Sequence, residues 1–222
     1  MSKTIVILGA SRGIGLGLAK TFLERGWNVV ASERSRSDEL HALDDDSLRI
    51  VTCDVTEPES YADLGLEDGA VDILLVNAGI SGAKHQSASQ ATADEVAHVM
   101  MTNAYGPTRA ARTLLGAVRD GGTVAFMSSL MGSITDSSGG YELYRASKTA
   151  LNMLAKGVAE QDAKGRDIEV LALHPGWVQT DMGGPNATLT IEQSVTGLAD
   201  VMEASGGGGF RYVDYSGKEL PF

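Results

Sequence analysis

The chain has 222 residues, 43% of them hydrophobic, which suffices for one sizeable domain with a buried core and argues against disorder. Acidic residues outnumber basic ones, 29 against 18, and the formal charge of −11 argues against nucleic acid as a partner. Cys53 is the only cysteine, so an internal disulfide is excluded and a reducing compartment is favoured.

The apolar runs are short. The first, Thr4–Leu8, stops at Gly9, and the runs Val71–Val76 and Ile168–Leu173 span six residues each. A secretory signal needs a longer apolar stretch than these, and a membrane-spanning helix needs about twenty residues. We therefore expect no membrane association and a cytoplasmic location.

Aliphatic or β-branched runs predict strands, and longer segments between them have helical patterns. Strands are expected at Thr4–Leu8, Asn28–Ser32, Leu48–Thr52, Val71–Asn77, Thr123–Ser128, Ile168–Leu173 and Phe210–Asp214. Helices are expected at Gly13–Arg25, Ala93–Arg119, Tyr144–Lys164 and Ile191–Ala204. Unbroken hydrophobicity is typical of strands buried on both faces of a parallel sheet. The pattern predicts an α/β fold, a single Rossmann-like, doubly wound parallel sheet of about seven strands with helices on both faces, formed by residues 1–222 as one domain.

A glycine-rich segment joins the first predicted strand to the first predicted helix. It consists of Gly9, Ala10, Ser11, Arg12, Gly13, Ile14 and Gly15. Glycines there allow a sharp turn and a close approach of the backbone to a pyrophosphate, and the helix N-terminus offers free N–H groups. The spacing is G-x-x-x-G-x-G rather than the G-x-G-x-x-G fingerprint, so a purely structural turn is the alternative to a dinucleotide site.

The end of the second predicted strand should select the nucleotide. Glu33 can accept hydrogen bonds from a free ribose 2′-hydroxyl, which favours NAD(H), whereas Arg34 can pair with a 2′-phosphate, which favours NADP(H). Arg12 adds a second cation on the same side. Two cations against one carboxylate favour NADP(H), with NAD(H) as the alternative. An exposed Glu33–Arg34 pair without a ligand is the structural alternative.

Tyr144 and Lys148 lie four residues apart on a predicted helix, which places both side chains on one face. A nearby ammonium, together with the positive nicotinamide of the oxidised cofactor, would stabilise a phenolate and lower the pKa of the phenol from about 10. Tyr144 can then donate a proton to a carbonyl oxygen as hydride arrives, and can remove it in the reverse reaction. Because this spacing is common, an ordinary helix surface is the alternative.

Two further segments can support this pair. Ser128 and Ser129 follow a strand at the edge where ligands bind in such folds, and we favour Ser129 to hold the substrate oxygen, with a simple cap as the alternative. Pro107 should free the Asn103 carbonyl from its helical partner. That carbonyl can hold a water that reaches Lys148, or the kink is purely structural.

Taken together, these residues resemble the short-chain dehydrogenase/reductase superfamily over nearly the whole chain. The matching pieces are Gly9–Gly15, Cys53-Asp54-Val55, Asn77-Ala78-Gly79, Asn103, Ser129, Tyr144, Lys148 and Pro175-Gly176. The resemblance implies that Tyr144 is the acid–base residue and that Lys148 lowers its pKa and binds the nicotinamide ribose. It also implies that Ser129 orients the substrate and that Asn103 supports a proton relay.

The resemblance further implies a set of cofactor contacts. Asp54 is expected to contact adenine, Asn77 and Gly79 to line the cofactor trough, and Pro175, Val178 and Thr180 to hold the nicotinamide end. The neighbouring Val55, Ala78 and Gly176 belong to the same predicted set. Leu8 stands where the family usually has a threonine, so a hydroxyl that stabilises the glycine turn is expected to be missing.

A narrower likeness covers His174–Gly184 and Ser216–Pro221, which resemble the C-factor and sniffer-like carbonyl reductases. This subgroup implies NADPH-linked carbonyl reduction, and some of its members are discussed as signalling proteins. The Gly-rich segment Trp177–Ala187 is a candidate lid. His41, His85 and His98 show no metal-ligand spacing, so no metal site is expected.

The leading hypothesis is thus an oxidoreductase that reduces a small ketone or aldehyde with NADPH. One alternative is a non-catalytic dinucleotide-binding regulatory protein on the same fold. Another is a dehydratase, epimerase or racemase, for which Glu142 could supply an added acid. The long helices Ala93–Arg119 and Tyr144–Lys164 are compatible with a homodimer.

Overall fold

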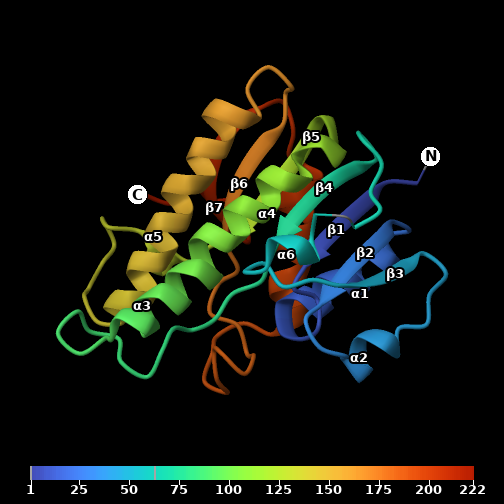
Figure 1. The fold of residues 1–222 in the computed structure, drawn as a ribbon. Helices are drawn as coiled ribbons and strands as arrows, with labels where there is room; N and C mark the ends of the chain where they lie inside the picture. The colour runs from blue at the N-terminus through green and yellow to red at the C-terminus, as the bar shows by residue number, and fades with distance from the viewer. Residues whose placement is uncertain (1, 63) are drawn as a thin grey trace.

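Seven parallel strands form one sheet in the computed structural model, which describes residues 2–62 and 64–222 and leaves Met1 and Asp63 outside the described residues. The strands are β1 (Thr4–Leu8), β2 (Asn28–Glu33), β3 (Leu48–Thr52), β4 (Val71–Val76), β5 (Val118–Met127), β6 (Glu169–His174) and β7 (Gly209–Asp214). Their order across the sheet is β3-β2-β1-β4-β5-β6-β7, with every pairing parallel (Figure 1). The predicted doubly wound parallel sheet is confirmed.

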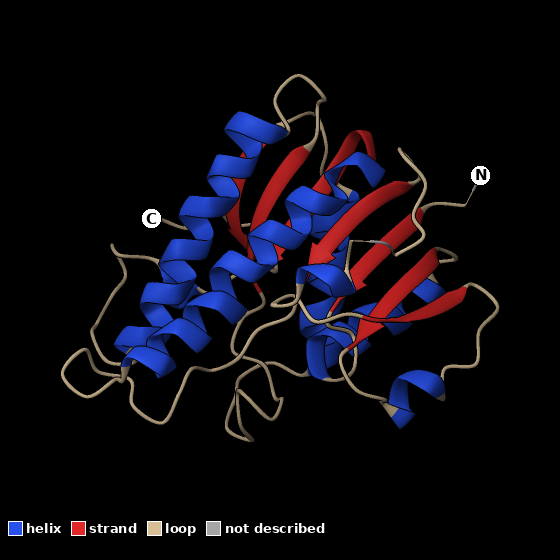
Figure 2. Ribbon diagram, in the orientation of Figure 1, coloured by secondary structure: helices blue, strands red, loops and turns tan. Residues whose placement is uncertain are grey.

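Helices cover both faces of this sheet. They are α1 (Gly13–Glu24), α2 (Asp38–His41), α3 (Ala93–Met100), α4 (Gly106–Leu114), α5 (Glu142–Gly157) and α6 (Ile191–Glu203). Figure 2 shows α3, α4 and α5 across one face, and α1 and α6 pack together on the other. All strand arrows in Figure 2 point towards one edge, so the loops that follow the strands collect there.

The core consists of two apolar layers separated by the sheet. Successive residues of a strand point to opposite faces, and in β4 Leu74 belongs to the layer under α4 and α5 while Leu75 belongs to the layer under α1 and α6. Phe126 fills the first layer and Phe22 the second, and both are fully buried. This two-sided burial explains why the strands are hydrophobic without alternation.

The predicted helix Ala93–Arg119 is wrong in its interior and at its C-terminal end. The chain instead forms α3, a π-helical turn at Met101–Tyr105, α4 and a 3₁₀ turn, and Arg119 already belongs to β5. Pro107 has no N–H and would break a regular helix. The Gly106 N–H bonds to the Met101 carbonyl, so α4 starts afresh with the proline in its first turn, where the missing N–H is not needed.

Smaller differences occur at two other helices. The helix at α2 was not predicted because it has only four residues, and it is initiated by the Ser37 hydroxyl, which accepts from the Leu40 N–H at 3.2 Å. The predicted helix Tyr144–Lys164 begins earlier, as α5, and continues only as a π-helical turn to Asp162. No described helix is long and apolar enough to cross a membrane.

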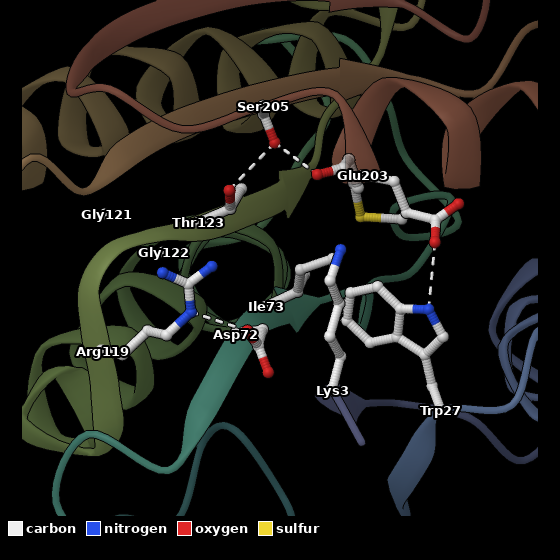
Figure 3. A pocket seen from close by; sticks show the side chains of 11 residues that line it. Lys3, Trp27, Asp72, Ile73, Arg119, Gly121, Gly122, Thr123, Glu203 and Ser205 are labelled. Carbon is white, nitrogen blue, oxygen red and sulfur yellow. Dashed lines mark hydrogen bonds and ion pairs between the residues drawn. The ribbon is translucent and has the colours of Figure 1, made fainter. Parts of the chain in front are cut away.

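Polar side chains gather near the amino ends of β1 and β4. A hollow of about 20 Å³ opens there, roughly the space of one water molecule (Figure 3). Its walls are tied by hydrogen bonds from Trp27 Nε1 to Glu203 at 3.0 Å and from Arg119 Nε to Asp72 at 2.6 Å. This hollow is too small for a substrate, and a larger cavity of about 290 Å³ lies at the amino ends of β6 and β7, beside Ile168 and Gly209. The segments predicted to form the site all lie at the opposite edge of the sheet.

Candidate active site

The carboxyl ends of four central strands bring the predicted segments together. The glycine turn Gly9–Gly15 follows β1, Asn77–Gly79 follows β4, Ser128 and Ser129 follow β5, and Pro175 follows β6. These four strands are consecutive neighbours in the sheet, and parallel strands deliver their following loops to one edge. Segments more than 160 residues apart in the sequence thus border one site, as the ion pair between Arg12 and Asp181 shows directly.

The glycine turn is built for a close approach of the backbone. Gly9 has φ of +96°, a conformation that residues with a side chain rarely adopt. A Cβ at Gly15 would overlap the Gly9 carbonyl oxygen and lie 2.7 Å from Asn77 Nδ2. That Asn77 amide donates to the same carbonyl at 2.7 Å and thereby fixes the turn to β4.

A hydroxyl does support this turn, although position 8 carries leucine. The Gly9 N–H donates to the Ser32 hydroxyl at 2.9 Å, and Ser32 is buried in β2. The expectation drawn from Leu8 is therefore wrong, because the neighbouring strand supplies the missing oxygen. Ser32 lies 23 residues away in the sequence, and only the sheet pairing reveals it.

The N-terminus of α1 is open to an anion. Its first flanking residue, Arg12, is extended with φ of −162°, and no side chain in the described part of the chain caps the helix. The first N–H groups of a helix have no partner within the helix and carry partial positive charge. With no side chain at Gly13 or Gly15, a phosphate can reach these N–H groups directly.

Glu33 is buried and is used to hold the loop that follows β2. Its two carboxylate oxygens accept from the Ser37 N–H at 2.6 Å and lie 2.9 Å from His41 Nε2. Burial by itself raises the pKa of Glu33, but the bonds to His41 and Ser37 outweigh it, so the pKa is lowered. The alternative of an exposed Glu33–Arg34 pair is therefore wrong. Both carboxylate oxygens of Glu33 already bond to residues of the loop after β2.

Three exposed cations surround this loop. Arg34 lies 3.8 Å from an Asp54 oxygen, Arg36 contacts Asp38, and Arg12 pairs with Asp181 at 2.9 Å. The Ser37 hydroxyl donates to the Ser11 carbonyl at 2.6 Å and so joins the loop to the glycine turn. Ion pairs this exposed are weak, so the arginines can exchange their carboxylates for a stronger anion such as a phosphate.

The residues predicted to contact adenine form a compact turn after β3. The Asp54 carboxylate accepts from the backbone N–H and the hydroxyl of Thr56, at 2.9 and 2.8 Å. Val55 is buried in the core layer under α4 and α5. The Asp54 N–H donates to the Ser60 hydroxyl at 2.9 Å, which keeps this turn beside the end of β2.

Tyr144, Ser129 and Lys148 come together from α5 and the end of β5. Tyr144 is half-buried, whereas Ser129 and Lys148 are buried. Burial raises the pKa of the Tyr144 phenol above its ordinary value, and a side-chain hydrogen bond with Ser129 opposes this effect. Lys148 Nζ lies 5.8 Å from the centre of the Tyr144 ring.

In the protein alone, burial sets the pKa of Tyr144, and the lowering predicted with the oxidised nicotinamide beside Lys148 stays a prediction. Lys148 Nζ donates to the Met127 carbonyl at 2.9 Å and lies beside the ring of Tyr144. Burial dominates the electrostatics of both groups, because it penalises the charged form of each. For Lys148, burial lowers the pKa to about 8.

Asn103 contributes through its side-chain amide. Its Oδ1 accepts from the Ile80 N–H at 2.8 Å, and its Nδ2 donates to the Ile80 carbonyl at 2.9 Å and to the Ser147 hydroxyl at 3.0 Å. A Cβ at Gly79 would lie 3.3 Å from Asn103 Oδ1 and 3.4 Å from Lys148 Nζ. Gly79 thus lets the loop after β4 pass directly over the lysine.

The segment after β6 closes the site from the side of the glycine turn. The Pro175 carbonyl accepts from the Ser194 hydroxyl at 2.6 Å, and Val178 pairs with Leu189 as a short bridge. A Cβ at Gly13 would contact the Thr180 methyl at 3.5 Å, so this segment lies against the start of α1. The remaining predicted residue of the segment, Gly176, has φ of +84° and turns the chain away from β6.

Two side chains that the sequence left unassigned now have defined positions. Trp177 is 53% exposed and its indole N–H donates to the Gly183 carbonyl at 2.9 Å, which braces the loop after β6. His174 is half-buried, burial lowers its pKa to about 4, and its Nδ1 has no partner among the described residues. His174 therefore stays neutral at physiological pH.

Gln86 is a site residue that the sequence analysis missed. Its side-chain oxygen accepts from the Tyr144 N–H at 3.2 Å, and its carbonyl accepts from the Leu143 N–H at 2.8 Å, so it caps the start of α5. Its position in a long loop gives no pattern from which this could be read. Glu142, the candidate added acid, accepts from the Ala88 N–H at 2.6 Å and serves the same loop.

No cluster of three or more potential metal-ligating side chains exists within residues 2–62 and 64–222. The site instead combines an uncapped helix N-terminus, a glycine cradle, and a buried lysine beside a tyrosine and a serine. A doubly wound sheet with this edge defines a dinucleotide-binding protein of the oxidoreductase class.

Comparison with known proteins agrees with this class. The family model described as short chain dehydrogenase matches residues 3–188. The chain belongs to the short-chain dehydrogenase family, and the resemblance inferred from its motifs is confirmed.

Three similar proteins illustrate the range of relatives. The protein named C-signal from Myxococcus xanthus is 41% identical over 162 residues, which is 69% of this chain and 94% of that protein. A carbonyl reductase from Pseudomonas aeruginosa PAO1, crystallised in complex with NADP, is 41% identical with a TM-score of 0.92, and each chain is covered fully. The carbonyl reductase Sniffer of D. melanogaster is 27% identical with a TM-score of 0.90, again over the whole of both chains.

Replacing Gly15 with alanine should abolish tight dinucleotide binding, because the new methyl group would overlap the Gly9 carbonyl and force the turn apart. We expect the dissociation constant for NADPH, measured by fluorescence titration, to rise by about 100-fold or more, which corresponds to about 3 kcal/mol. Gly157→Ala is the matched control, since Gly157 lies in α5 with Arg112 as its nearest neighbour at 3.7 Å. Unchanged affinity in Gly15→Ala would contradict the role of the turn.

Burial of Lys148 should make stability depend on pH. Between about pH 8 and the ordinary lysine value of 10.5, the unfolded chain holds a proton that the folded chain has released, so this group makes the free energy of unfolding rise with pH. Lys148→Met removes the effect. The stability of the variant relative to the wild type should fall by about 3 kcal/mol between pH 7 and pH 10.5, as measured by urea unfolding.

Lys156→Met provides the control for this comparison, because Lys156 lies on the same helix but is 54% exposed. A difference between Lys148→Met and wild type that stays constant with pH would show that the ammonium is not desolvated in the fold.

Proposed function

We propose that the protein is an NADPH-dependent carbonyl reductase in which Tyr144 protonates the oxygen of a ketone or aldehyde. The observation that carries the proposal is the meeting of Ser129, Tyr144 and Lys148 at the edge of the sheet where α1 presents its uncapped N-terminus. The relatives described as carbonyl reductases, one of them in complex with NADP, support the same activity.

The chain offers a complete set of groups for the dinucleotide. The N–H groups of Gly13 to Gly15 and of the preceding turn would bind the pyrophosphate, with Asn77, Ala78 and Gly79 along the trough. Arg12 and Arg34 would bind the 2′-phosphate, and Lys148 would bind the nicotinamide ribose. When bound, NADPH supplies the hydride.

Internal use of the Glu33 carboxylate favours NADP(H) over NAD(H). A carboxylate that selects NAD(H) accepts a hydrogen bond from the ribose 2′-hydroxyl. In this chain the oxygens of Glu33 are bonded to Ser37 and His41. The cations Arg34 and Arg36 are exposed beside them, ready for a doubly charged phosphate.

The raised pKa of Tyr144 suits an acid that works in the direction of reduction. At neutral pH the phenol carries its proton and can donate it to the oxygen of the substrate. The Ser129 hydroxyl interacts with the same phenol and would hold the substrate oxygen between the two groups. Asn103 keeps the loop above Lys148 in place through Ile80 and Ser147.

The cytoplasmic location and the homodimer remain predictions. Apolar side chains on the outer surface of the α3–α5 layer support the second of these, since Val96, Tyr105 and Met153 are 40%, 54% and 71% exposed. Size-exclusion chromatography with light scattering would decide between monomer and dimer.

Tyr144→Phe should lower kcat for any carbonyl substrate by at least about 100-fold, because the proton donor is lost while the ring stays in place. The dissociation constant for NADPH should stay within about twofold of the wild type, since the phenol does not carry the cofactor. Stopped-flow turnover over a panel of ketones and aldehydes, together with fluorescence titration, measures both quantities.

Tyr105→Phe is the control for that variant, because Tyr105 is exposed and lies outside the site. Comparable turnover by Tyr144→Phe and the wild type would remove Tyr144 from its proposed role. Saturable NADPH binding by the wild type with no turnover on the panel would instead favour the non-catalytic regulatory alternative.

Arg34→Ala should weaken NADPH binding by about tenfold and leave NADH binding within about twofold, because a charge-assisted bond to the 2′-phosphate is lost. Separate titrations with the two nucleotides test this. Arg112→Ala, which removes an arginine paired with Asp162, is the control. Equal losses for NADPH and NADH would argue that Arg34 does not face the 2′ position.

A further inference from the structure

A tyrosine from the last strand reaches the backbone of the proposed substrate-binding serine. Tyr212 lies in β7, is buried, and its hydroxyl donates to the carbonyl oxygen of Ser129, 83 residues earlier in the chain. The same carbonyl accepts from the Gly132 N–H at 2.8 Å. The Ser129 turn therefore has one anchor within itself and one on a distant strand.

Burial raises the pKa of Tyr212 to about 12, against the opposing effect of a side-chain interaction with Asn152. The negative charge of Asp136 and the phenol of Tyr144 raise it further. The phenol of Tyr212 thus keeps its proton and acts as a permanent hydrogen-bond donor to Ser129, unlike a group that titrates during the reaction.

Asn152 holds the residue before Ser129. The Ser128 hydroxyl donates to Asn152 Oδ1 at 2.6 Å, and both side chains are buried. Asn152 follows Lys148 by four residues and Tyr144 by eight, so the three lie along one face of α5. Its Nδ2 makes no well-formed hydrogen bond in the described chain, yet the amide is close enough to Tyr212 to affect its pKa.

The other end of the turn is pressed against the same helix. A Cβ at Gly132 would lie 3.0 Å from Asn152 Nδ2 and 3.0 Å from the carbonyl carbon of Lys148. The Thr149 hydroxyl donates to the Gly132 carbonyl at 3.0 Å. Side chains from α5 and β7 therefore fix the turn from Ser128 to Gly132 at both ends, close to Tyr144 and Lys148.

We propose that Tyr212 and Asn152 are positioning residues, which hold the Ser129 turn in register with Tyr144 so that both hydroxyls face one substrate oxygen. The proposal rests on the reductase function stated above and assigns to it two residues that touch neither substrate nor cofactor. Their effect passes through the Ser129 backbone and the Ser128 hydroxyl. A displacement of about 1 Å in such a group costs about 100-fold in rate, so small changes in this turn should be visible.

Tyr212→Phe keeps the ring that packs against Phe222 and removes only the hydroxyl. We expect kcat to fall by about tenfold or more while the dissociation constant for NADPH and the KM of the carbonyl stay within about threefold. Tyr61→Phe is the matched control, because Tyr61 is fully buried and its hydroxyl also has one hydrogen bond, from Arg109 Nε at 2.8 Å.

A double-mutant comparison separates positioning from a general loss of stability. If Tyr212 acts through Ser129, Tyr212→Phe should lower kcat in the wild type but change it by less than about twofold in a Ser129→Ala background. A structural effect would lower kcat equally in both. Asn152→Leu should show the same dependence on Ser129.

Hydrogen–deuterium exchange provides a readout that needs no turnover. The amides of Met131 and Gly132, which bond to the hydroxyl and the carbonyl of Ser129, should exchange at least about tenfold faster in Tyr212→Phe than in Tyr61→Phe. Unchanged exchange of these amides would overturn the proposal.

The two proposals fail in distinguishable ways. A wild type that reduces carbonyls, with Tyr212→Phe equally active or equally impaired in both backgrounds, overturns the positioning role and leaves the reductase function intact. A wild type without any carbonyl turnover overturns the reductase function, and exchange at Met131 and Gly132 then decides whether Tyr212 holds the turn.

Discussion

The site depends on an ammonium group placed where water cannot reach it. Lys148 is 4% exposed, and its charge is met by the Met127 carbonyl at the very end of β5. A buried charge is stable only where polar groups lie close to it. The end of β5, helix α5 and the loop after β4 therefore all have to be placed correctly around Lys148. A side chain at Gly79 would meet the Lys148 ammonium, and a side chain at Gly132 would meet the backbone of α5 at Lys148.

Burial of the lysine and of the tyrosine beside it would also favour the reductive direction of the proposed reaction. In the structure burial raises the pKa of Tyr144 and lowers that of Lys148 to about 8, so at neutral pH the phenol is neutral and the lysine still carries most of its charge. The spacing of the two residues in the sequence indicates the attraction between a phenolate and an ammonium, but it does not indicate the burial that disfavours the charged form of each group. A neutral phenol is a ready acid, whereas a phenolate requires an additional positive charge close to its oxygen.

The sequence predicted the sheet well because each strand carries its own signal. The apolar run of β1 gave its bounds directly, and the glycine turn after β1 has a local spacing. The same holds for Tyr144 and Lys148, which share one helix. What could not be predicted are contacts between elements, such as those of Ser32 with Gly9 and of Gln86 with Tyr144, since the pairs are 23 and 58 residues apart.

The predicted helix Ala93–Arg119 was wrong because of an irregular turn, and that turn affects where the side chains on either side of it point. The π-helical turn at Met101–Tyr105 takes up one residue more than a regular turn, and an extra residue rotates everything beyond it by about 100°. Asn103 in the widened turn can therefore point inward to Ile80, while Ala110, Ala111 and Leu114 of α4 still face the sheet. A regular helix through both segments would not give Asn103 and the residues of α4 these two orientations. The π-helical turn therefore lets the side chains before it face the site and the side chains after it face the core.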